Sequence, residues 1–366
     1  MPAESKMATL FQKWNPYLAM ILLQFGYAGM NIITKLSLNG GMSHYVLVVY
    51  RHAFATVSIA PFALIFEWKT RPKMTFWIFT QIFVLGLLGP VIDQNLYYAG
   101  LKYTSPTFSC AMSNILPAMT FVMAVFCRME RIDIKKVRSQ AKVAGTVVTV
   151  SGAMVMTLYK GPLVDILRVH SSTVPTAAAA ALADKNWFKG SIFLIIATWS
   201  WAALFIIQAY TLKRYTAQLS LTTLICLLGT IQSIAVTFVM EHDLSKWKIG
   251  WDVNLFAAAY AGIVTSSIAY YVQGLVINRK GPVFASAFSP LMMIIVAVMG
   301  AFILAEKIFL GGIIGAVLIV VGLYSVLWGK HKETDDQQFC MEVVDEMDLE
   351  KEKGKETYKL QELMHV

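Results

Sequence analysis

The chain of 366 residues is 57% hydrophobic and only 14% charged, whereas a soluble domain carries about a quarter charged residues. Together with a mean hydropathy of +0.59, this composition predicts a membrane protein and argues against a soluble domain. The net charge of +9 does not indicate a nucleic-acid partner, because Lys and Arg gather in the cytoplasmic loops of membrane proteins.

Ten apolar segments follow one another along the chain, and each has the ~20 residues needed to cross the hydrocarbon layer as a helix. We expect an all-α polytopic membrane protein, because backbone polar groups in lipid must pair within their own segment. The loop Arg128–Lys142 alone holds six Lys and Arg, and this bias predicts that both termini are cytoplasmic. The predicted spans are roughly 16–36, 45–66, 76–98, 105–127, 141–159, 188–208, 217–240, 254–277, 283–304 and 309–328.

These segments predict two halves. Residues 1–15 form a short cytoplasmic N-terminus, 16–159 the first half, 160–187 a linker loop and 188–329 the second half. Residues 330–366 form a charged cytoplasmic tail, which from Glu333 onward holds 11 of the chain's 22 acidic residues. We expect this tail to be disordered or weakly helical.

An internal repeat relates the two halves. The stretch Lys102–Glu130 returns without a gap as Asn278–Glu306, so that the closing glutamates align. Because each half has five spans, an odd number, the second half must enter the membrane inverted. Inverted repeats are typical of transporters that alternate access around a site near the midplane. The loop that follows this stretch is six residues shorter in the second copy. Beyond it two glycine pairs match, Gly145 with Gly315 and Gly152 with Gly322.

Three charged residues, Lys35, Arg51 and Asp93, fall in one layer toward the outer ends of the first three spans. One interpretation is a gate or a site for a zwitterion, with the cations near a carboxylate and Asp93 near an ammonium group. The alternative is an internal ion pair between the second and third spans. Breaking such a pair leaves a buried lone charge, at a cost of roughly 3–5 kcal/mol.

Neutral polar residues provide further candidates for substrate binding. Hydrogen-bonding amides on the first, third and fourth spans suit a polar substrate, and interhelical hydrogen bonds explain them equally well. For four further candidates, the alternative to substrate binding is a role in helix packing. The amides are Asn31, Gln94, Asn95 and Asn114, and the further candidates are Tyr97, Trp201, Tyr271 and Gln273.

Pro117 and Pro290 lie inside the fourth and ninth spans, where each is expected to kink its helix, either as a hinge or simply for packing. Glu130 and Glu306 are interpreted as markers of the ends of those spans. The sequence contains no Walker motif, zinc-ligand spacing or nucleophile elbow. We therefore expect no enzyme activity, catalytic residue, metal or cofactor. The expected partners are a small-molecule substrate and membrane lipid, and the oligomeric state stays open.

Several long motifs resemble those of a known family. They include LYYAGLKYTSPTFSCAMSNILPAMTF and YAGIVTSSIAYYVQGLVINRKGPVFASAFSPLMMIIVAVMG. The chain resembles, over about residues 16–330, the plant nodulin-like EamA-type transporters of the drug/metabolite transporter superfamily. That family includes the "usually multiple acids move in and out" and "walls are thin" proteins. The matching positions among the candidates are Gln94, Asn95, Tyr97, Asn114, Pro117, Gln273 and Pro290.

The resemblance implies ten helices in two inverted EamA repeats and a bidirectional facilitator that mainly exports amino acids. It implies the plasma membrane, with the vacuolar membrane as an alternative. Two other functions stay open. One is a carrier of auxin or another small organic anion, and the other is a membrane scaffold or signalling protein that acts through the acidic tail.

Overall fold

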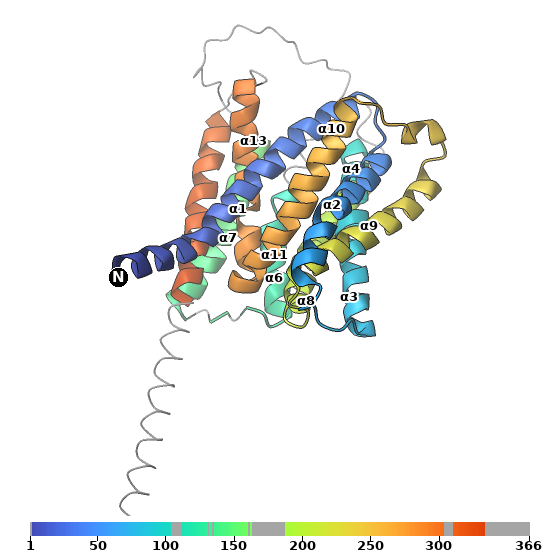
Figure 1. Cartoon of the computed structure of the whole chain (residues 1–366). Helices are drawn as coiled ribbons and strands as arrows, with labels where there is room; N and C mark the ends of the chain where they lie inside the picture. The colour runs from blue at the N-terminus through green and yellow to red at the C-terminus, as the bar shows by residue number, and fades with distance from the viewer. Residues whose placement is uncertain are drawn as a thin grey trace, which may run out of the picture.

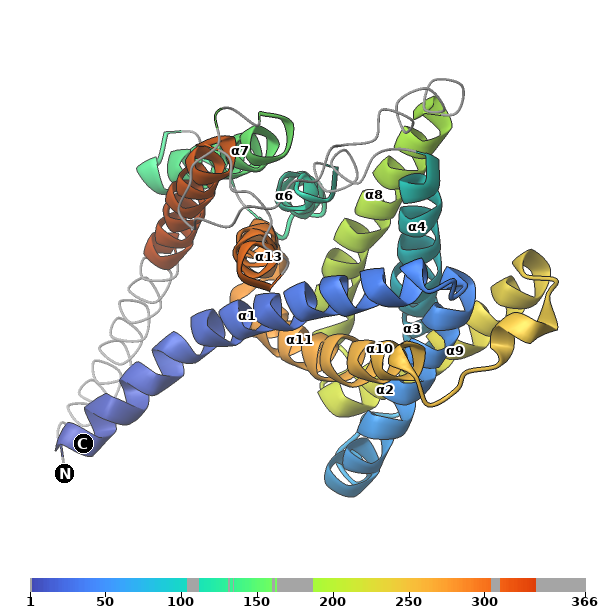
Figure 2. The same ribbon diagram turned by 90° about the horizontal axis from the view of Figure 1, so that it is seen from above.

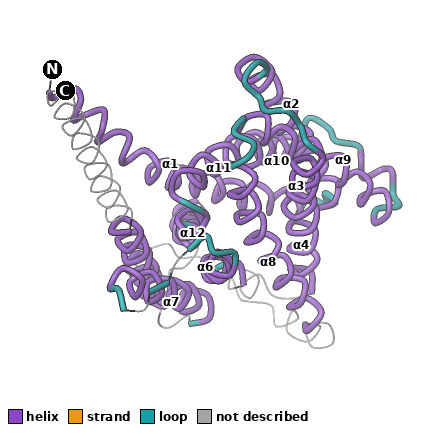
Figure 3. The backbone as a smooth tube through the Cα atoms, turned by 90° about the horizontal axis from the view of Figure 1, so that it is seen from below, coloured by secondary structure: helices purple, strands orange, loops and turns teal. Residues whose placement is uncertain are grey.

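The computed structural model describes residues 2–103, 112–130, 132–133, 135–159, 162, 187–303 and 310–333. Within these ranges every regular element is helical, and Figure 3 shows only helices joined by loops. The prediction of an all-α fold is therefore confirmed. The predicted tail beyond Glu333 and nearly all of the predicted linker lie outside the described residues.

Helices occupy all ten predicted segments within the described ranges (Figure 1). The first half contains α1 (Pro2–Asn39), α2 (His44–Glu67), α3 (Phe76–Gly86), the π-helical turn η1 (Leu87–Asp93), α4 (Gln94–Tyr103), α6 (Leu116–Phe126) and α7 (Val137–Leu158). The second half contains α8 (Trp187–Leu212), α9 (Gln218–Met240), the short 3-10 helix η3 (Leu244–Trp247), α10 (Val253–Tyr260), the π-helical turn η4 (Ala261–Ile268), α11 (Ala269–Lys280), α12 (Pro282–Ala287), α13 (Ser289–Ile303) and a last helix, Leu310–Glu333.

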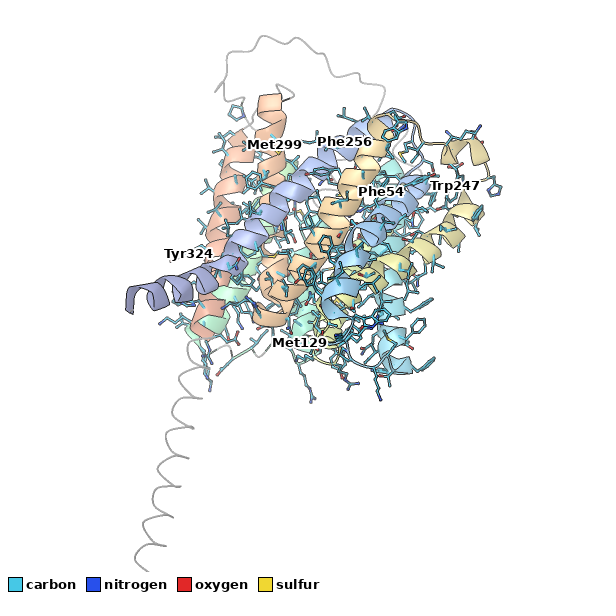
Figure 4. All side chains as sticks on the ribbon, in the orientation of Figure 1. Phe54, Met129, Trp247, Phe256, Met299 and Tyr324 are labelled. Atoms are coloured by element: carbon cyan, nitrogen blue, oxygen red, sulfur yellow. The ribbon has the colours of Figure 1, made fainter. Side chains whose placement is uncertain are left out.

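Eight helical stretches in the described residues are long and apolar enough to cross a membrane. The two other predicted spans correspond to α6, which is shorter, and α7. Large apolar side chains cover the outside of the bundle. Phe126 is 87% exposed, and Tyr324 points away from the last helix in Figure 4. Such a surface requires a hydrocarbon environment, so the chain is a multi-pass membrane protein.

The two halves pack through equivalent contacts. Helix α1 packs against α13, and its counterpart α8 packs against α6, the counterpart of α13. Likewise α1 lies beside α10 and α11 (Figure 2), while α8 lies beside α4. The helices α2 and α9, which occupy the same position in their halves, pack against each other. The two π-helical turns, η1 and η4, also fall at matching places in the repeat.

Glycines bring α7 and the last helix into close contact. A Cβ atom at Gly145 would lie 2.7 Å from the carbonyl oxygen of Gly322, and one at Gly152 would lie 2.9 Å from that of Gly315. The two helices are therefore antiparallel at this contact. Because the repeat matches Gly145 with Gly315 and Gly152 with Gly322, exchanging the halves turns one contact into the other.

We expect Gly152→Ala to destabilise the bundle by about 1–3 kcal/mol, because its new methyl group meets the backbone of the last helix at under 3 Å. Gly312→Ala is the matched control, since no atom of the described residues lies within 4 Å of a Cβ atom there. It should leave stability unchanged or slightly raised. The measurement is thermal unfolding of both purified variants in detergent. Equal unfolding temperatures would show that the helices separate there at no cost.

The two prolines stand at helix breaks. The chain turns at Asn114 and Ile115 before Pro117 enters the first turn of α6. It leaves the helix at Phe288, between α12 and α13, and Pro290 is the second residue of α13. Each predicted kink is thus an interruption of the helix, with the proline placed where a missing N–H costs no intrahelical hydrogen bond.

Glu130, predicted only to mark the end of a span, belongs to a buried network of ion pairs. Its carboxylate is paired with Lys330 and also accepts a 2.9 Å hydrogen bond from Nζ of Lys142, whose side chain is fully buried. Lys142 Nζ also lies 3.0 Å from Glu333 Oε2. The predicted boundary placed Lys142 at the start of the span that begins near residue 141. Helix α7 begins at Val137 instead, and this puts the lysine inside the bundle.

Candidate functional site

A central cavity with a volume of about 190 Å³ lies among helices of both halves. Its walls come from α1, α2, the η1–α4 junction, the turn before α6, α8, α11, α12 and α13. Pockets for drug-sized ligands occupy ~300–1,000 Å³, so this cavity suits a small metabolite. Eight of the predicted residues line it, namely Asn31, Arg51, Asp93, Gln94, Tyr97, Asn114, Trp201 and Gln273.

The two π-helical turns position the charged groups of the cavity. Asp93 is the last residue of η1, and Gln94 begins α4 immediately after it. On the opposite half, Ser266 of η4 accepts a 2.6 Å hydrogen bond from Nε of Arg51. π-Helical turns commonly mark functional positions, because the extra residue redirects the side chains around it.

Arg51 and Asp93 line the same cavity, yet no direct ion pair joins them within the described part of the chain. The Arg51 side chain is buried, and within the described residues it donates its hydrogen bond to Ser266. A guanidinium and a carboxylate therefore face one small space without neutralising each other by contact. The side chain of Lys35 lies outside the described residues.

Several polar atoms at the cavity have no hydrogen-bond partner among the described residues. They include the Tyr27 hydroxyl, Oε1 of Gln94 and Nε2 of Gln273, all of them buried. An unpaired buried polar group costs about 1–3 kcal/mol. A polar ligand that bonds to these donors and acceptors recovers that energy, so the cavity favours a ligand with several polar groups.

Two asparagines bond to methionine sulfur atoms across the cavity. Asn114 Nδ2 lies 2.9 Å from Sδ of Met293, and Asn31 Nδ2 lies 3.3 Å from Sδ of Met292. A thioether is a weak acceptor, so a ligand oxygen can displace it at small cost. Both amides are consistent with substrate binding and with helix-to-helix contact.

Two predicted residues do not line the cavity. Asn95 donates a 2.8 Å hydrogen bond to the carbonyl oxygen of Val91, one turn earlier. The backbone carbonyl oxygen of Tyr271 accepts a 3.0 Å hydrogen bond from Nε2 of Gln218. Pro117 and Pro290 are also absent from the walls, although their neighbours Leu116 and Ser289 are present.

The cavity also contains residues that the sequence analysis missed, notably Tyr27 and Thr198. Tyr27 lies three residues after Gln24 and four before Asn31, so all three share one face of α1. That spacing was the available signal. Thr198 has no such signal in the sequence; in the structure its hydroxyl donates a 2.9 Å hydrogen bond to the carbonyl of Leu194, one turn earlier.

Comparisons with known proteins agree with this architecture. The family model for the EamA-like transporter family matches the chain twice, at residues 14–158 and 188–328. The chain belongs to the EamA-like transporter family. It is therefore a membrane transporter, and its relatives in a plant confirm the expected resemblance to the plant EamA-type branch of the drug/metabolite transporter superfamily.

The relatives of this EamA-type transporter in Arabidopsis thaliana include two WAT1-related proteins. At5g07050 is 69% identical over 87% of this chain and 81% of its own length. At3g56620 is 57% identical over 88% of this chain and 85% of its own length. A solved crystal structure shares the fold with a TM-score of 0.66 at 15% identity, over 86% of this chain and 98% of that one.

Proposed function

We propose that this EamA-type transporter is a bidirectional facilitator of amino acids, acting mainly in export. The observation that carries the proposal is the placement of Arg51 and Asp93 on one small cavity without a direct ion pair between them. An α-amino acid carries a carboxylate and an ammonium group, which these two side chains complement. The unpaired amide and hydroxyl groups then bind the remaining polar atoms.

Alternating access follows from the arrangement of the halves. We infer ten spans as two inverted repeats, 16–159 and 188–329, with both termini cytoplasmic. The exchange-symmetric contact between α7 and the last helix supports this inference, as do the paired π-helical turns. In such a carrier, rocking one half against the other opens the cavity to each side in turn. The resemblance to the plant family favours the plasma membrane.

The test is efflux and uptake of a labelled panel of amino acids and auxin, in proteoliposomes and in oocytes. We expect movement of amino acids down their gradient in both directions and no dependence on a proton gradient. If auxin moves and no amino acid does, the organic-anion alternative holds instead. If neither moves, the carrier proposal with these substrates fails.

A role for the acidic tail is tested by truncation. Because Glu333 belongs to a buried ion network, the tail should be cut after this residue. We expect the chain 1–333 to keep the transport rate of the full chain in proteoliposomes, with equal amounts of protein measured by immunoblot. Loss of transport despite normal insertion would favour a function that depends on the tail.

A further inference from the structure

A second, larger cavity lies beyond the central one on the face where the proposed topology places both termini. Its volume is about 650 Å³. Its walls come from the ends of α6, α8, α11 and the last helix, together with Tyr17 of α1. Met129, which lines it, lies at one end of the bundle in Figure 4, whereas Phe256 lies toward the other.

The two cavities are separated by about one helical turn, because neighbouring residues of the same helices face different cavities. On α8, Phe205 lines the central cavity and Ala209 the larger one. On α1, Tyr17 lines the larger cavity and Met20 the central one. Four residues of a helix rise ~6 Å, so only a thin layer stands between the cavities.

That layer is aromatic and densely packed. The rings of Tyr17 and Phe284 meet edge to face with centroids 5.1 Å apart, and Phe288 packs on Phe284 at 5.3 Å. Phe284 and Phe288 are each 1% exposed and belong to the main core cluster. The layer joins α1 of the first half to α12 of the second, so relative movement of the halves acts directly on it.

The larger cavity is basic. Arg128, Lys213, Arg279 and Lys280 line it, along with Lys330. The two carboxylates in its wall, Glu130 and Glu333, are already paired with Lys142 and Lys330. Among the described lining residues, Arg128, Lys213 and Arg279 therefore face no further carboxylate, and this charge attracts anions.

We propose that the larger cavity is the inner vestibule of the transport path, that the Tyr17–Phe284 layer is its gate, and that the vestibule cations gather anionic substrates such as acidic amino acids. The proposal rests on the transport function proposed above. Its gate is tested by accessibility without any substrate, so that failure of the gate and failure of the substrate assignment are separate results.

The gate experiment follows a single thiol at Ser289→Cys, in a chain whose native cysteines are replaced by alanine. Ser289 is half-buried and lines the central cavity. In inside-out vesicles, a membrane-impermeant thiol reagent should label this position about two- to tenfold faster when Tyr17→Ala is added, as expected for loss of one aromatic pair. Tyr17 is half-buried, so its truncation leaves the buried rings of Phe284 and Phe288 in place.

Two controls make the result specific. Asn278→Cys lies in the vestibule wall and is exposed, so it should label equally fast with either residue at position 17. Phe238→Ala removes one ring of a stacked pair with Trp247, 5.3 Å apart and away from both cavities, and it should not change labelling at position 289. An unchanged rate at position 289 in the Tyr17→Ala chain would overturn the gate.

The charge experiment compares two double variants that lose the same charge. Lys213→Gln with Arg279→Gln alters the vestibule, whereas Lys69→Gln with Lys73→Gln alters exposed positions of the same proposed face outside it. We expect the vestibule variant alone to raise KM for cytoplasmic glutamate about tenfold at low salt, and less at high salt. Equal KM values in both variants would overturn the anion assignment.

Discussion

Arg51→Gln and Asp93→Asn are each expected to lower amino-acid transport by about tenfold to a hundredfold, as loss of a charge-assisted contact predicts. Each side chain lines the central cavity, and Arg51 is only 5% exposed. The readout is the initial uptake rate in proteoliposomes with matched protein content. A substrate analogue without its amino group should be insensitive to Asp93→Asn and remain sensitive to Arg51→Gln.

The double variant distinguishes the two interpretations of these charges. Since no direct ion pair joins them in the described structure, the two losses should add as free energies. A double variant that transports better than either single variant would instead indicate an ion pair. Ser266→Ala is the control, because it removes the 2.6 Å hydrogen bond to Arg51 and keeps both charges. It should cost less transport than Arg51→Gln.

Lys142→Met should destabilise the protein by about 3–5 kcal/mol, because it leaves the carboxylates of Glu130 and Glu333 with only Lys330 between them. The lysine is fully buried, so water cannot compensate for the lost partner. Thermal unfolding in detergent measures the effect. The matched control is Lys136→Met, whose pair with Asp133 at 3.8 Å is about half exposed and contributes under ~1 kcal/mol.

Restoring the charge balance should recover part of that loss. Adding Glu130→Gln to Lys142→Met leaves Lys330 paired with Glu333, at 3.3 Å. We therefore expect the double variant to unfold at a higher temperature than Lys142→Met alone, a coupling typical of residues in one network. A double variant less stable than either single variant would show that the two side chains act independently.

The sequence predicted the helices well because each span must satisfy its own backbone in lipid. It also predicted eight residues of the central cavity, since polar side chains within apolar spans must face protein or a water-filled space. Asn95 and Tyr271 do not line the cavity, because they lie one or two positions from the residues of α4 and α11 that do. Residues so spaced point to different faces of a helix, and the sequence alone did not show which face meets the cavity.

The sequence by itself determined the helical class, the repeat and the presence of charged groups within the membrane, because these depend on composition and local periodicity. Only the tertiary structure decided which of those groups meet. It brought Arg51 to Ser266 rather than to Asp93, and it buried Lys142 between Glu130 and Glu333. The same packing brought the rings of Tyr17 and Phe284 into contact. Such contacts join residues far apart in the chain, and helix rotation and tilt set them.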